Sequence, residues 1–183
     1  PPAGRGAMVV SAGGQLPIPG FRNSTVRHPT SVIEARFHRA LDDDASIDRV
    51  VLLGRSLGSY VAVSLANTRP VRGVILATPF DSIASIGEKR YPFLPLQLLV
   101  GDRYNSIEQA PAIKQPALFL IAENDDVTPP ENGERLAKAW GGPSRVHLLR
   151  DTGHRMVEWR DDYWKEINAF LDGIATARAI AGQ

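Results

Sequence analysis

One serine lies in a pattern that is typical of an activated nucleophile. Residues 54–58 read Gly-Arg-Ser-Leu-Gly, so Ser56 stands between two glycines at the spacing G-x-S-x-G. A short apolar run precedes this motif and a helical pattern follows it, which is the strand–turn–helix context that the motif requires. A serine on so tight a turn crowds its own backbone, so the flanking positions must be glycine. The pattern predicts a hydroxyl at a helix N-terminus, where the Leu57 amide can stabilise an oxyanion.

A serine hydroxyl is a poor nucleophile without a base, and the chain has four histidines. His28 lies in an irregular N-terminal segment. His38 falls on the polar side of a predicted helix, and His147 alternates with apolar residues in a predicted strand. Only His154, in the run Asp-Thr-Gly-His, lies on a glycine-bearing loop just past the end of a strand. His154 is therefore the predicted base.

The base needs a carboxylate that orients the imidazole and balances its charge. Residues 122–130 follow a buried strand and contain Asp125 and Asp126, one connection before the histidine loop. Asp125 is the first candidate and Asp126 the second. Asp81 stays open as well, because it follows another buried strand on the same rim of the sheet. The two that are not the acid are expected to be solvated loop carboxylates or helix caps.

Strands and helices must alternate to place these residues together. Apolar runs predict strands at residues 7–10, 49–53, 72–77, 117–122 and 145–149. Helices are expected at residues 57–67, at residues 130–140, from Asp161 onward, and from the capping box at Ser31. Buried strands that alternate with helices predict an α/β fold with a mostly parallel sheet of about five strands, covered on both faces. Ligands bind such sheets at the carboxyl ends of the strands.

Composition limits the function classes. The 183 residues are 43% hydrophobic and 22% charged, which suits one soluble domain over residues 1–183, with residues 1–29 an irregular, atypical segment. The formal net charge of +1 comes without a basic run, so no nucleic-acid partner is expected. The absence of cysteine excludes disulfides and thiol nucleophiles. No cluster has metal-ligand spacing, so neither a metal nor another cofactor is expected.

The chain gives weaker signals about its compartment. Its longest apolar run, residues 117–122, is far shorter than the roughly 20 residues that a membrane span needs. No signal peptide is recognisable, and a chain without cysteine fits a reducing compartment, so we expect a cytoplasmic location. The sequence begins at Pro1 rather than Met, which leads us to expect a processed, trimmed or fragmentary product.

From about residue 30 to its end, the chain resembles the α/β-hydrolase superfamily. The resemblance is to its small, lid-poor members near the abhydrolase, serine aminopeptidase and dienelactone-hydrolase-like proteins. It rests on residues 50–58, 78–82 and 91–95, on an acid loop at 122–130 and on the Gly-His pair at 153–154. The resemblance implies that Asp125 is the acid by register, beside Ser56 and His154.

The same resemblance implies hydrolysis of an acyl bond in a small-molecule substrate. A carboxylic ester is the first expectation, cleaved through an acyl intermediate on Ser56, with thioesterase and peptidase as alternatives. Four side chains follow or flank the rim loops and are candidates for an acyl pocket, with a core role equally open. They are Phe80, Tyr91, Phe93 and Met156.

The N-terminal part departs from the family pattern. Family members carry several strands before the serine motif and a loop that gives a second oxyanion amide. By connectivity, the strand at 7–10 takes the place just before the helix at Ser31, so the strand that bears the oxyanion loop is predicted to be missing. Residues 11–14, Ser-Ala-Gly-Gly, are expected to form a plain loop, although their amides could substitute.

A missing donor has two consequences. Turnover of ordinary esters is expected to be feeble, and a catalytically weak or inactive binding module, or a fragment, becomes the main alternative function. A sheet that stops early also predicts an exposed edge at the strand 7–10 or at its neighbour. We therefore expect a homodimer through that edge.

Overall fold

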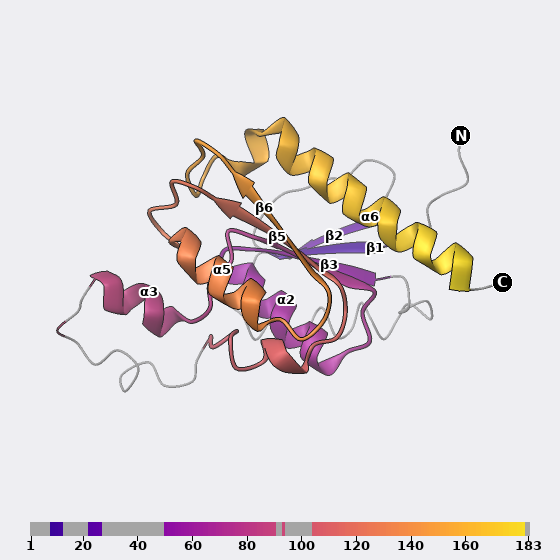
Figure 1. The fold of residues 1–183 in the computed structure, drawn as a ribbon, viewed down its shortest axis with the longest axis horizontal. Helices are drawn as coiled ribbons and strands as arrows, with labels where there is room; N and C mark the ends of the chain where they lie inside the picture. The colour runs from indigo at the N-terminus through magenta and orange to yellow at the C-terminus, as the bar shows by residue number, and fades with distance from the viewer. Residues whose placement is uncertain (1–7, 13–21, 27–49, 91–92, 94–103, 182–183) are drawn as a thin grey trace.

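The computed structural model describes residues 8–12, 22–26, 50–90, 93 and 104–181 (Figure 1). The predictions for Tyr91, for the helix that begins at Ser31 and for the last two residues of the run 11–14 fall outside these residues. The same is true of His28 and His38.

A six-stranded sheet forms the centre of the described residues, and every pair of neighbouring strands is parallel. The order across the sheet is β2-β1-β3-β4-β5-β6. In chain order the strands are β1 (Met8–Ala12), β2 (Arg22–Val26), β3 (Val50–Arg55), β4 (Gly73–Ala77), β5 (Ala117–Ala122) and β6 (Ser144–Leu149). The predicted α/β class with a mostly parallel sheet is confirmed.

Successive side chains of the central strands point to opposite faces of the sheet and contribute to two separate hydrophobic clusters. In β3, Leu52 belongs to one buried cluster and Leu53 to the other. The first cluster includes side chains of α2 (Leu57–Thr68) and α5 (Pro130–Ala139), and the second includes side chains of α6 (Asp161–Ala181). Figure 1 shows α6 on one side of the sheet, with α2 and α5 on the other. Burial on both faces explains why the strands read as continuous apolar runs.

Three shorter helical segments complete the described part of the chain. They are α3 (Ile83–Arg90), η2 (Ala110–Ala112) and η3 (Val157–Trp159). The 3-10 helix η3 lies between β6 and α6 and follows the predicted histidine loop directly. Within the ranges given above, no helix is both long and apolar enough to cross a membrane.

The strand β2 was not predicted, so the sheet has one strand more than the expected five, and residues 1–29 are not irregular throughout. Its sequence, Arg-Asn-Ser-Thr-Val, has one strongly apolar residue in five and therefore carries no hydrophobic periodicity. The five strands that were predicted are present within two residues of the expected bounds, as are the helices α2, α5 and α6.

The position of β1 corrects the prediction for the N-terminal part. β1 pairs with β3 on one side and with β2 on the other, and Ala12 at its end lies opposite Gly54. It is β2, not β1, that precedes the segment with the capping box at Ser31. The carboxyl end of β1 therefore lies beside the serine motif, and the strand that we expected to be missing at this place is present.

Candidate active site

The serine motif forms a sharp turn between β3 and α2. Ser56 has φ 52° and ψ −123°, a backbone conformation that side-chain-bearing residues rarely adopt. Its amide donates to the carbonyl of Ala77 at 2.9 Å, which ties the turn to the end of β4. A Cβ on Gly54 would lie 2.4 Å from the carbonyl oxygen of Gly58, so only glycine fits two positions before the serine. The predicted context of the motif, strand before and helix after, is confirmed.

Leu57 begins α2, and its side chain is 46% exposed. An amide at the first helical position has no carbonyl partner within its own helix. The N-terminal end of the helix also carries a partial positive charge. The amide of Leu57 is thus a donor suited to an oxyanion formed beside Ser56.

His154 lies on the loop that follows β6, and its imidazole contacts the serine. The distance from His154 Nε2 to Ser56 Oγ is 3.0 Å. His147, in contrast, lies within β6 and its Nε2 is 3.3 Å from the carboxylate of Asp162 in α6. Among the described histidines, the structure therefore brings only His154 to Ser56.

Asp125 lies on the other side of the imidazole. Its Oδ2 and Oδ1 are 2.8 Å and 3.0 Å from His154 Nδ1, and the residue is buried. Asp125 Oδ1 also accepts hydrogen bonds from the backbone amides of Val127 at 2.9 Å and Thr128 at 2.7 Å. Burial raises the pKa of the Asp125 carboxyl, but the hydrogen bond and charge of His154 and the two loop amides outweigh it and lower the pKa below 3.8. The carboxylate is therefore ionised at neutral pH.

The hydrogen bonds assign the protons on the imidazole. A carboxylate without a proton only accepts, so His154 Nδ1 carries the proton that goes to Asp125. In the neutral ring, Nε2 is then the acceptor and points at the Ser56 hydroxyl. This is the arrangement that a general base next to a serine nucleophile requires.

Thr128 is a part of the site that the sequence analysis missed. Its hydroxyl lies 3.0 Å from Asp125 Oδ2, 3.2 Å from His154 Nδ1 and 3.2 Å from the carbonyl of Thr78. Thr128 thereby links the acid loop to the residue that follows β4. The residue lies in the segment 122–130 that we identified as the acid loop, but nothing in the pattern distinguishes it from its neighbours.

The two other candidate acids lie elsewhere. Asp126 is exposed, and within the described residues no hydrogen bond joins it to His154. Asp81 is buried and accepts from Arg135 Nε at 2.7 Å and from Asn132 Nδ2 at 2.9 Å, so it joins α5 to the loop after β4. Asp81 is thus neither the partner of the imidazole nor the solvated carboxylate or cap expected of a candidate that is not the acid.

The candidate acyl-pocket residues differ in their surroundings. Phe80 is among the largest fully buried side chains, which favours the core role that was left open. Met156 is two residues after His154 and 54% exposed, so it remains available to a substrate. Phe93 is almost fully exposed.

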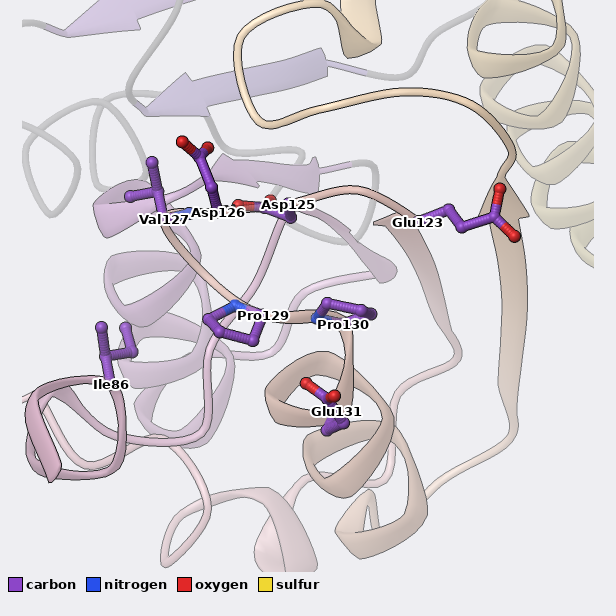
Figure 2. Close-up of a pocket in the computed structure, with 8 residues that line it drawn as sticks. All are labelled: Ile86, Glu123, Asp125, Asp126, Val127, Pro129, Pro130 and Glu131. Atoms are coloured by element: carbon purple, nitrogen blue, oxygen red, sulfur yellow. Dashed lines mark hydrogen bonds between the residues drawn. The ribbon is translucent and has the colours of Figure 1, made fainter. Parts of the chain in front are cut away.

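A cavity of about 410 Å³ lies on the acid-loop side of the site (Figure 2). Its lining consists of Ile86 in α3 and residues of the loop and first turn of α5, namely Glu123, Asp125, Asp126, Val127, Pro129, Pro130 and Glu131. Neither Ser56 nor His154 belongs to this lining among the described residues, and neither do Phe80, Phe93 and Met156. Four carboxylates among eight residues make it an unsuitable place for an acyl chain.

The sequence matches a known family over most of its length. Residues 35–173 match the family described as serine hydrolase. The chain belongs to the serine hydrolase family. The match includes the serine motif, the acid loop and the histidine loop, so the expected superfamily is confirmed; the particular branch is not resolved.

This member of the serine hydrolase family has relatives in a bacterium and in a plant. The chain is 36% identical over 143 residues to an uncharacterized protein of Mycobacterium tuberculosis, covering 76% of this chain and 49% of the relative. It is 31% identical over 152 residues to the alpha/beta hydrolase domain-containing protein WAV2 of Arabidopsis thaliana, covering 72% of this chain and 49% of the relative. The chain thus spans about half the length of the curated relatives it matches.

Solved structures of α/β hydrolases share the fold. One is an alpha/beta hydrolase enzyme from the metagenome of lagoon sediments of Mar Chica, Morocco, with a TM-score of 0.68 and 20% sequence identity. The comparison covers 96% of this serine hydrolase chain and 93% of that one. At this identity the likeness shows the fold alone.

Proposed function

We propose that the chain hydrolyses carboxylic esters through an acyl intermediate on Ser56. The observation that carries this proposal is the continuous line of hydrogen bonds from the Ser56 hydroxyl through both nitrogens of His154 to Asp125. The family match and the strained turn at Ser56 support it.

The first half of the reaction forms the acyl-enzyme. His154 Nε2 takes the proton of the Ser56 hydroxyl as Oγ bonds to the carbonyl carbon of the ester. The carbonyl oxygen becomes an oxyanion, which the Leu57 amide stabilises. As the C–O bond to the alcohol breaks, the proton on Nε2 goes to the departing alkoxide. Asp125 balances the positive charge that the imidazole carries between these two transfers.

The second half releases the acid. A water molecule gives its proton to His154 Nε2 and its oxygen to the acyl carbon, and collapse of the new oxyanion breaks the bond to Ser56. The proton returns from Nε2 to Ser56 Oγ, which restores the resting state. Thioesters and peptides would react by the same steps. The ester is preferred to the peptide because an alcohol leaves the tetrahedral intermediate more readily than an amine, and the thioester stays the alternative.

A second oxyanion donor is proposed on the strength of the β1 position. Because Ala12 lies opposite Gly54, the chain leaves β1 beside the turn that carries Ser56. Gly13 and Gly14, whose amides could serve as this donor by sequence, lie outside the described residues, so the proposal rests on the position of β1. If an amide at this place supplies the second donor, ordinary esters and not only activated ones are substrates, in contrast to the feeble turnover expected from the sequence.

Labelling with a fluorophosphonate tests the proposal. The wild-type chain should be modified at Ser56, and Ser56→Ala should lose both the label and ester turnover, by about a millionfold if the triad acts as a unit. Ser64→Ala, two turns further along the same helix, is the matched control and should behave as wild type. Labelling at another residue, or turnover that persists in Ser56→Ala, contradicts the assignment.

The same protein sample separates an enzyme from a binding module. With an activated nitrophenyl ester, an acyl-enzyme gives a burst of nitrophenolate equal to the number of active sites. A chain that binds the ester but neither shows a burst nor takes the fluorophosphonate is the binding module that the sequence left as an alternative.

A further inference from the structure

Arg55 lies between Gly54 and Ser56, and its side chain reaches the histidine loop. It is the last residue of β3, and its side chain is 17% exposed. Its Nη2 donates to the carbonyl oxygen of His154 at 2.9 Å, a contact between residues 99 positions apart. Its Nε lies 3.3 Å from Glu158 Oε1. Both of these side-chain contacts are thus with the segment that carries His154.

Glu158 is itself held in place from the other side. It lies in η3, and its side chain is 25% exposed. The indole nitrogen of Trp164 in α6 donates to the Glu158 carbonyl at 2.9 Å. Burial raises the pKa of the neighbouring Tyr163 hydroxyl, and the charge of Glu158 raises it further. The 3-10 turn after His154 is therefore fixed between β3 and α6.

We infer that Arg55 is a positioning residue that sets the distance between nucleophile and base. It is bonded covalently to Ser56 and by a hydrogen bond to the backbone of His154, so it joins the two reacting residues by a route that does not use their side chains. This inference rests on the proposed function.

The route matters most after acylation. Once Oγ carries the acyl group, the Ser56 hydroxyl no longer donates to His154 Nε2, and one of the contacts that hold the imidazole is lost. The Asp125 contact orients the ring, and the Arg55 contact holds the backbone from which the ring extends. Arg55 thus keeps His154 in position to activate water for the second half of the reaction.

Arg55→Met tests the inference, since it keeps most of the length of the side chain and removes its hydrogen bonds. The variant should lose about ten- to a hundredfold in kcat, because a small displacement of a catalytic group has that effect. KM should fall together with kcat, because slower deacylation lets the acyl-enzyme accumulate while binding and acylation stay in place. Arg55→Lys should recover part of the loss. With a nitrophenyl ester, the burst should persist while the steady rate falls, which reports slow deacylation.

Arg150→Met is the matched control. Arg150 precedes the same loop, but its side chain is 73% exposed and pairs with Glu123 at 3.4 Å rather than with His154. It should keep the wild-type kcat. Far-UV circular dichroism of each variant establishes that rates refer to folded protein.

A double variant covers the case in which Arg55→Met leaves Glu158 as an uncompensated charge and fails to fold. Arg55→Met with Glu158→Met removes both charges and still lacks the hydrogen bond to His154, so it should fold and show the same loss of kcat. Wild-type kcat per folded molecule in either variant overturns the inference and leaves the proposed function standing. A wild-type chain that takes no fluorophosphonate overturns both.

Discussion

At the scale of single residues, the site assigns different tasks to three aspartates that follow buried strands. Asp125 contacts the imidazole, Asp81 pairs with Arg135, and Asp126 faces solvent. Sequence order alone could not separate them, because all three lie on the same rim of a parallel sheet. What distinguishes Asp125 is that the loop amides of Val127 and Thr128 donate hydrogen bonds to its carboxylate and hold it toward the imidazole.

Asp125→Asn should lower kcat about ten-thousandfold, because an amide cannot balance the charge on His154 and favours the wrong tautomer of its ring. Asp126→Asn should leave kcat near the wild-type value. Rates with one activated ester, measured for both variants at equal concentrations of folded protein, check the prediction. A crippled Asp126→Asn variant would contradict the assignment of the acid.

The lowered pKa of Asp125 predicts how the free energy of unfolding depends on pH. Its pKa in the folded chain lies below its ordinary value of 3.8, so the unfolded chain takes up the proton first. The stabilisation from this group is complete well above pH 3.8 and is lost as the pH falls through the folded-state pKa. Urea unfolding of wild type and Asp125→Asn between pH 6 and pH 2 should show wild type losing its relative stability on the acid side. Parallel curves for the two proteins would contradict this.

Sequence patterns selected Ser56, His154 and Asp125, which the structure brings together, because each lies in a short local signature next to a strand end. Thr128 and Arg55 could not be recognised in the same way. Their contacts join residues 26, 50 and 99 positions apart and depend on how the loops meet after the sheet has formed. Local sequence patterns can identify candidate site residues, but the residues that position them can be recognised only from contacts in the folded structure.

At the scale of elements, the turn between β3 and α2 leaves no space for a side chain at Gly54. A Cβ on Gly54 would lie 2.7 Å from the Cα of Ser59 and 2.8 Å from the Cβ of Ala62 as well as close to the Gly58 carbonyl. Because these are backbone atoms and a short side chain of α2, they cannot rotate away. The glycine thus allows the helix to begin directly against the strand.

Gly54→Ala should lower the free energy of unfolding by about 1–3 kcal/mol, the usual cost of overpacking. Gly173→Ala is the control, because nothing lies within 4 Å of a Cβ at this exposed position in α6. That change should raise stability by about 0.5–1 kcal/mol through helix propensity. Urea midpoints measure both, and equal shifts in the same direction would contradict the argument.

The bounds of most helices and strands could be predicted from the sequence, but the order of the strands in the sheet could not. Five strands were found from apolar runs, yet β1 was given the wrong neighbour and β2 was missed. Which strand lies beside β3 is decided by crossover connections, not by the residues of the strand itself. That one error produced the expectation of a missing oxyanion strand.

At the scale of the whole molecule, β2 and β6 are the two outer strands of the sheet in the described part of the chain. Of the two places predicted for the edge, β1 is excluded because it has a partner on each side, and its neighbour β2 is the outer strand. We keep the proposal of a twofold dimer through β2. Light scattering at increasing concentration should show the mass of two chains, and a monomer at high concentration would contradict it.

The contact between Arg55 and His154 also has a consequence for the order in which the chain becomes active. Parallel strands pair only after long crossovers, so such sheets fold slowly. The proposed nucleophile and its turn lie in the first third of the sequence, whereas the proposed base belongs to the segment that follows β6, the outer strand nearest the C-terminus. During synthesis or refolding, Ser56 can reach its native turn while it still lacks a base. The chain should remain inert toward esters until β6 docks, and a fluorophosphonate added at timed intervals should follow that last step.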